Sequence, residues 1–192
     1  MALALVLTAA ATALSVRLTP ATDASLRALG PHLDRIAAAR GFPRVEEPRF
    51  ARRPCRMNAL AGAAEARYLG RTYLRDLEMY EVAVYRVPEP RARTREVVSG
   101  LLRCGSFESS TSEGPFRFAI TAVEGPAPDG SVRYRLHGTG AGGRLTTYSN
   151  VRLLAVGPYL LYVNHQLAFT DPPPSSVESF AAEAAGALEA HG

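Results

Sequence analysis

Apolar residues recur at helical spacing in three separate segments of the chain. In the first segment Pro31 suits the opening turn of a helix better than its interior, so this helix is predicted to run from near Gly30 to Gly41. A shorter second helix ends at the pair Cys104-Gly105, and the last helix follows three prolines, with Ser175 and Glu178 at capping-box spacing. The apolar faces are Leu26, Leu29, Leu33 and Ile36; Val97, Val98, Leu101 and Leu102; and Val177, Phe180, Ala181, Ala184 and Leu188.

Alternating apolar and polar residues predict strands between these helices. Glu78 to Val87 is apolar on both faces, which is typical of a central strand, and Arg67 to Asp76 reads as a weaker strand or an irregular edge. Four more strands are separated by glycine- or proline-containing turns, whereas the serine-rich region from Phe107 to Glu113 is predicted to be a loop. The four strands are Phe116–Glu124, Ser131–Gly138, Leu145–Val156 and Tyr159–Ala168.

This order of elements predicts an α+β domain with a central antiparallel sheet of about six strands and helices packed on it. Consecutive strands joined by short turns pair antiparallel, and helices separated from them in sequence cover the sheet. Residues 26–192 are expected to form this single domain, after a leader of residues 1–25. The 192 residues are 47% hydrophobic and 21% charged, which is ordinary for a globular fold.

The N-terminus and the two cysteines bear on the compartment. Ala2 to Ala11 is apolar and Ala11-Thr12-Ala13 matches a signal-peptidase site, although no basic residue precedes the run, so a signal peptide competes with a buried helix or strand. In a secreted or cell-envelope protein, Cys55 and Cys104 would form one disulfide, whereas in a reducing cytosol they would be thiols. Neither cysteine has the context of a lipid anchor, so membrane association would need an anchor outside this sequence.

The sequence contains no complete catalytic, metal-binding or cofactor-binding pattern. It has no Gly-x-Ser-x-Gly motif, and the glycine run from Gly138 to Gly143 lacks the Lys-Ser/Thr ending and the following helix of a phosphate loop. His137 and His165 lie on separate predicted strands and could meet in space, but no third ligand has suitable spacing, so a hydrogen-bonded or exposed histidine is the expected role. The net charge of +4 comes entirely from arginine rather than lysine, and without a nucleic-acid-binding motif it does not predict nucleic-acid binding.

One set of arginines could form a binding surface. If Phe118, Val132, Tyr134 and Leu136 face the helices, strand alternation places Arg117, Arg133, Arg135 and His137 on the opposite face, where Arg152 could join them. Such a face suits carboxylate or phosphate groups, which pair with guanidinium. The alternative is a solvated sheet face whose arginines reflect the codon usage of a GC-rich genome.

The order of several segments resembles the PknH-like extracellular sensor domains of actinobacterial receptor kinases and lipoproteins. The resemblance covers Phe42 to Ala190 and rests on the helix ending at Cys104, the strand Glu78–Val87, Asn150-Val151, Val156-Gly157-Pro158-Tyr159 and the alanine-rich last helix. It implies an α+β sandwich that binds an unidentified ligand outside the cytoplasm without catalysing a reaction. The chain has two cysteines where the kinase sensor has two disulfides, and it has no kinase domain.

These observations predict a non-catalytic ligand-binding or sensing domain without a cofactor, whose ligand is a small anionic molecule or an envelope component. Two other functions remain open at this point. The chain could be an envelope protein-interaction module, which a broad exposed apolar patch would indicate. It could also be a small hydrolase, which would need titratable groups converging in one pocket.

Overall fold

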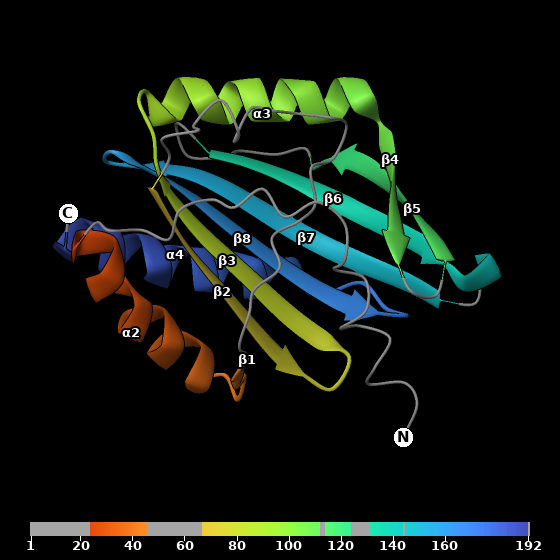
Figure 1. Cartoon of the computed structure of the whole chain (residues 1–192), viewed down its shortest axis with the longest axis horizontal. Helices are drawn as coiled ribbons and strands as arrows, with labels where there is room; N and C mark the ends of the chain where they lie inside the picture. Colours follow the sequence, from red (N-terminus) through yellow and green to blue (C-terminus); the bar gives the residue numbers. More distant parts are fainter. Residues whose placement is uncertain (1–23, 46–66, 112–113, 124–130, 144, 192) are drawn as a thin grey trace.

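The computed structural model describes residues 24–45, 67–111, 114–123, 131–143 and 145–191 (Figure 1). These residues form one eight-stranded sheet, three α-helices and a short 3₁₀ turn. The helices are α2 (Ala24–Ala38), α3 (Pro90–Cys104) and α4 (Pro174–His191), and the turn is η2 (Ala141–Gly143). The strands are β1 (Arg44–Val45), β2 (Arg67–Arg75), β3 (Glu78–Arg86), β4 (Ser106–Thr111), β5 (Gly114–Ala122), β6 (Ser131–Gly140), β7 (Leu145–Val156) and β8 (Tyr159–Ala168).

The sheet confirms the predicted α+β class but has eight strands rather than about six. Its order is β1-β2-β3-β8-β7-β6-β5-β4, and all neighbouring strands pair antiparallel. Strand β8 lies between β3 and β7, so it joins the β2–β3 hairpin to the meander formed by β4 to β7. The segment Ser106–Thr111 is strand β4, so the prediction of a loop there was wrong. An edge strand that pairs only with β5 needs no apolar alternation, and its polar sequence therefore gave no strand signal.

The first helix begins earlier than predicted. It starts at Ala24 rather than near Gly30, so Pro31 lies inside it. Leu26 and Leu29, which precede Pro31, are 0% and 1% exposed. Burial of each leucine side chain stabilises the fold by about 1.5–3 kcal/mol. The two leucines together therefore offset the roughly 3 kcal/mol that a proline inside a helix costs. Helix α3 likewise begins before its apolar residues, at Pro90, a residue that is favourable in the first turn.

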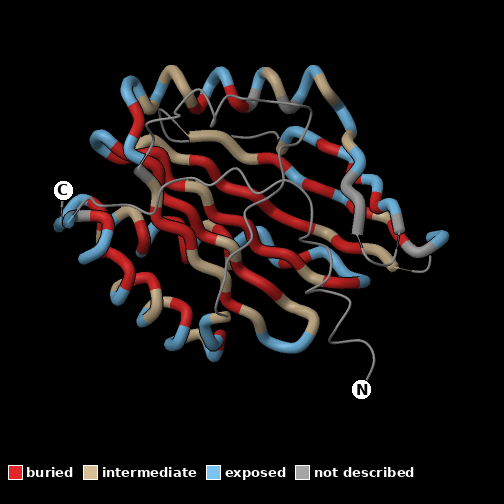
Figure 2. The backbone as a smooth tube through the Cα atoms, viewed as in Figure 1, coloured by how far each residue is buried: buried red, intermediate tan, exposed pale blue. Residues whose placement is uncertain are grey.

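Helices cover both faces of the sheet. Helix α3 lies across one face, while α2 and α4 pack together on the other (Figure 1). The α2/α4 side encloses the larger core, which groups Tyr73, Tyr80 and Phe180 with the leucines of α2 and the alanines of α4. The α3 side has its own core around Tyr85, Val97 and Phe118. The central strands are accordingly the most buried part of the backbone (Figure 2).

Two sequence-based predictions concern residues outside this description. The proposed leader lies almost wholly in residues 1–23, and Cys55 lies in the undescribed stretch 46–66. Cys104 ends α3. Both the signal peptide and the Cys55–Cys104 disulfide therefore stay predictions. None of the described helices is long and apolar enough to cross a bilayer.

Candidate functional site

Five residues singled out in the sequence lie on one face of the sheet, the face that carries α2 and α4. Arg133 on β6 is directly opposite Arg152 on β7, and Arg135 is opposite Asn150. Arg117 on β5 is directly opposite Thr139 on β6. Thr139 lies six residues after Arg133 on the same strand, so the side chains of Thr139, Arg133 and Arg117 share one face of the sheet. We call Arg117, Arg133, Arg135, His137 and Arg152 the arginine face. The other side of these strands carries the apolar residues Phe116, Phe118, Tyr134 and Leu136, in the core beneath α3.

Helix α4 covers the inner end of the arginine face. The carboxylate of Glu178 contacts two guanidinium groups: Oε2 lies 3.1 Å from Nε of Arg152, and Oε1 lies 3.7 Å from Nη1 of Arg133. Arg152 is only 4% exposed. Burial lowers the pKa of its guanidinium, Glu178 opposes this effect, and Arg133 adds to it. Glu178 was identified in the sequence only by its capping-box spacing, because its contacts across the sheet depend on how α4 docks.

The outer end of the arginine face is exposed. Arg117 forms an exposed ion pair with Glu108 of β4, with Nη2 of Arg117 2.8 Å from Oε1 of Glu108. His137 is exposed, and its ring stacks on that of Tyr148 with centroids 4.6 Å apart. Arg135 is also exposed and forms no ion pair within the described ranges. Arg135 is thus the cation of this face most available to a ligand.

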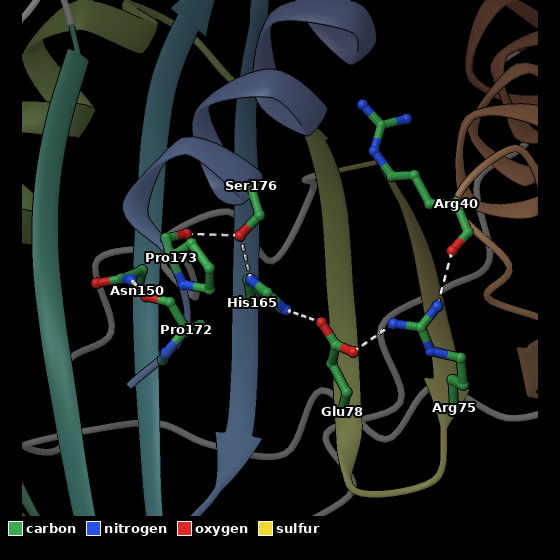
Figure 3. Close-up of polar contacts among 8 residues, drawn as sticks. All are labelled: Arg40, Arg75, Glu78, Asn150, His165, Pro172, Pro173 and Ser176. Carbon is green, nitrogen blue, oxygen red and sulfur yellow. Dashed lines mark hydrogen bonds and ion pairs between the residues drawn. The ribbon is translucent and has the colours of Figure 1, made fainter. Parts of the chain in front are cut away.

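A second polar group, the His165 cluster, lies under the start of α4 (Figure 3). It consists of His165 on β8, Glu78 on β3 and Ser176 on α4. Nε2 of His165 lies 2.7 Å from Oε1 of Glu78, and its Nδ1 lies 2.5 Å from Oγ of Ser176. The hydroxyl of Ser176 also donates to the carbonyl oxygen of Pro173 at 2.6 Å. This chain of contacts links two strands to the first turn of α4.

The His165 cluster continues outward to α2. The other carboxylate oxygen of Glu78 accepts a hydrogen bond from Arg75 on β2, at 2.5 Å, and Arg75 donates to the carbonyl oxygen of Arg40 beyond the end of α2 (Figure 3). Burial raises the pKa of Glu78, but the hydrogen bonds from Arg75 and His165 together lower it by more than burial raises it, so the net shift is downward. The carboxylate is therefore held in its charged form as the central acceptor of the chain.

The serine, histidine and glutamate of this cluster are hydrogen-bonded in that order, and the histidine between them is buried. His165 is 1% exposed, and both of its ring nitrogens are engaged within the protein. Oγ of Ser176 lies 2.5 Å from Nδ1 of His165 and 2.6 Å from the carbonyl oxygen of Pro173, so its single proton has two acceptors within reach. The cluster therefore serves to anchor α4 to the sheet.

The structure does not bring His137 and His165 together. In the strand register His137 is opposite Tyr148, whereas His165 is opposite Asn150, so β7 separates the two histidines. His165 is a buried, hydrogen-bonded histidine and His137 an exposed one, which are the two ordinary roles expected from the sequence. Within the described ranges, no three His, Cys, Asp or Glu residues are grouped as they would be to hold a metal ion.

Comparisons with known proteins identify the fold. No protein-family model matches the chain, and no curated protein matches its sequence. Among solved structures, the chain is similar to the extracellular domain of PknH from Mycobacterium tuberculosis. The superposition has a TM-score of 0.63 at 12% sequence identity, and covers 89% of this chain and 98% of the PknH domain. At this identity the likeness shows a shared fold and no more.

Proposed function

We propose that this chain is a non-catalytic, extracytoplasmic binding or sensing domain that takes an anionic ligand on its arginine face. The single observation that carries the proposal is the gathering of five cationic or titratable side chains on one sheet face. Directly opposed like charges such as Arg133 and Arg152 destabilise a sheet. An anion bound between them would reduce this electrostatic repulsion. The shared fold with an extracellular domain supports the compartment and the sensing role.

The other two functions receive less support from the described residues. Among the side chains whose burial the structure describes, the strongly exposed large apolar ones are Leu102 and Phe169, at 41% and 50%. They belong to different elements, since Leu102 lies on α3 and Phe169 follows β8, so they form no broad apolar patch of the kind that binds proteins. A hydrolase would need a base within reach of its substrate, and His165 is only 1% exposed.

The ligand class can be tested with two probes that separate its possible sources. Inorganic phosphate stands for a small acidic molecule and poly-glutamate for an acidic envelope polymer, and binding of each is measured by calorimetry at low and high salt. The double variant Arg117→Ala with Arg135→Ala should weaken binding at least about tenfold, since even one charge-assisted hydrogen bond contributes roughly 1.5–3 kcal/mol when well formed. Its salt dependence should also decrease.

The matched control is Arg95→Ala. Arg95 is exposed on α3, on the other side of the sheet, so this variant removes one positive charge without touching the arginine face. It should change affinity by less than about twofold, since exposed charges farther apart than a Debye length are largely screened. Equal affinity of the wild-type, Arg95→Ala and double-variant proteins, or no binding of either probe, would refute the proposal.

The compartment has its own test. We propose that the chain is exported and that Cys55 and Cys104 form a disulfide after export. Thiol titration of the denatured, non-reduced protein from culture medium should then find no free thiol. Two free thiols, or a protein confined to the cytosol, would contradict this part of the proposal.

A further inference from the structure

Arg133 and Arg152 share a carboxylate contact. The two residues lie directly opposite each other on β6 and β7, and one carboxylate, that of Glu178, contacts both. Among the described residues no second carboxylate forms an ion pair with Arg152. The carboxylate of Glu178 therefore contacts two guanidinium groups, and that of Arg152 is almost fully buried.

Arg152 also has unused hydrogen-bonding capacity. Its Nε and Nη1 atoms are buried and have no hydrogen-bond partner, because Glu178 approaches Nε closely enough for an ion pair but not in hydrogen-bonding geometry. Buried donors without acceptors each cost roughly 1–3 kcal/mol, and more when the group is charged. A planar guanidinium of this kind is suited to accept a carboxylate or phosphate through two parallel N–H···O bonds.

Glu178 is the movable member of this group. Its side chain is 34% exposed, whereas that of Arg152 is 5% exposed and is fixed between the sheet and α4. Rotation of Glu178 into solvent would return its carboxylate to water, while an incoming oxyanion would take over its contacts with Arg152. The next residue on this face of β6, Arg135, is exposed and would reach a second anionic group of the same ligand.

From this geometry we infer that Glu178 is an internal competitor for the ligand: it occupies the Arg133–Arg152 pair, and a compact oxyanion displaces it. The inference rests on the proposed anion-binding function and adds its regulation. Glu178 and Ser176 both belong to the opening turns of α4, so displacement of Glu178 acts directly on the turn that the His165 cluster anchors. Ligand binding is thereby linked to the position of α4, which a signalling partner could detect.

The deciding experiment compares phosphate affinity in variants of α4. Glu178→Gln keeps the shape of the side chain and removes the competing charge, so inorganic phosphate should bind about tenfold tighter than to the wild type, equivalent to roughly 1.4 kcal/mol. The matched control is Glu183→Gln, which removes a carboxylate from the Arg40 ion pair on the same helix, away from the arginine face. This control should leave phosphate affinity within about twofold of the wild type. Adding Arg152→Met to Glu178→Gln should abolish the gain.

The outcomes separate this inference from the proposed function. If the wild type binds phosphate and Glu178→Gln binds it equally or more weakly, the anion-binding function stands and the competitor is refuted. If neither protein binds phosphate, the competitor is refuted together with the small-anion form of the function, which leaves the polymer probe. If Glu178→Gln does not fold, the carboxyl ¹³C signal of Glu178 is followed in the wild type. It should move with phosphate on the same binding curve as the backbone signals of α4, and a stationary signal would overturn the inference.

Discussion

The ring of Tyr80 stacks on that of His165 with centroids 4.2 Å apart and planes 1° from parallel. Phe180 of α4 stacks on Tyr80 in turn, so three rings form one continuous stack that starts at the imidazole. Burial lowers the pKa of His165 below its ordinary value of 6.5, and the hydrogen bond and charge of Glu78 offset this only in part. The unfolded chain therefore takes up this proton at a higher pH than the folded chain.

The free energy of unfolding is accordingly expected to decrease as the pH falls below 6.5. Urea denaturation at about pH 7.5 and about pH 5.5 measures this difference, in a range above the ordinary titration of carboxylates. The variant His165→Gln should show a smaller difference than the wild type, whereas the exposed His137→Gln should retain the wild-type difference. A stability that rises on acidification would show that His165 is protonated more readily in the fold than in the unfolded chain.

Two glycines offer a test of packing with opposite expected signs. A Cβ atom at Gly140 on β6 would overlap the ring of Phe116, so Gly140→Ala should destabilise the protein by about 1–3 kcal/mol. At Gly186 in α4 nothing lies within 4 Å of such an atom, so Gly186→Ala should stabilise the helix by about 1 kcal/mol. Thermal unfolding of the two variants checks both signs, and a tolerated Gly140→Ala would mean that β5 and β6 are packed more loosely.

Tyr73 links the sheet to α2 through its hydroxyl, which donates to Oδ1 of Asp34 at 2.9 Å. Burial and the neighbouring carboxylate of Asp34 raise the pKa of this phenol, so the group remains a proton donor at any physiological pH. Tyr73→Phe removes the hydrogen bond while keeping the buried ring, and should cost about 1–2 kcal/mol of unfolding free energy. Tyr148→Phe, on a ring that is only partly buried, is the control and should cost less.

A buried Arg152 without its carboxylate partner should lower the free energy of unfolding more than the absence of both charges does. Glu178→Ala leaves the guanidinium without its carboxylate and is expected to cost about 1–3 kcal/mol, a value below that of a fully buried pair because Glu178 is one-third exposed. Adding Arg152→Met should recover most of this loss, since an apolar side chain of similar length replaces the uncompensated charge. Chemical denaturation of the single and double variants measures the recovery, and an additive second loss would contradict it.

Much of the fold could be predicted because its elements carry regular apolar patterns. The strands β5 to β8 and the helix α4 alternate or repeat clearly, and strand alternation alone was enough to group Arg117, Arg133, Arg135 and His137. The polar edge strand β4 and the start of α2 were missed, since the first needs no apolar face and the second depends on the burial of Leu26 and Leu29.

The candidate site was less predictable than the fold. The sequence could place the arginines on one face, but it could not predict which helix covers them. Glu178 contacts the arginines, and Ser176 contacts His165, only after α4 has docked on the sheet. The separation of His137 from His165 depends on the strand order, in which β7 stands between their strands. Local patterns carry no information about such an order.

The central place of β8 has a consequence for how the chain acquires its structure. Until residues 159–168 have been made, β3 lacks its second neighbour and the meander ending in β7 remains a separate sheet fragment. A chain emerging from the ribosome or from a translocation pore would hold two incomplete pieces, which join into one sheet only when residues 159–168 have arrived. Deleting β8 is therefore expected to leave two open edges prone to aggregation rather than a smaller domain.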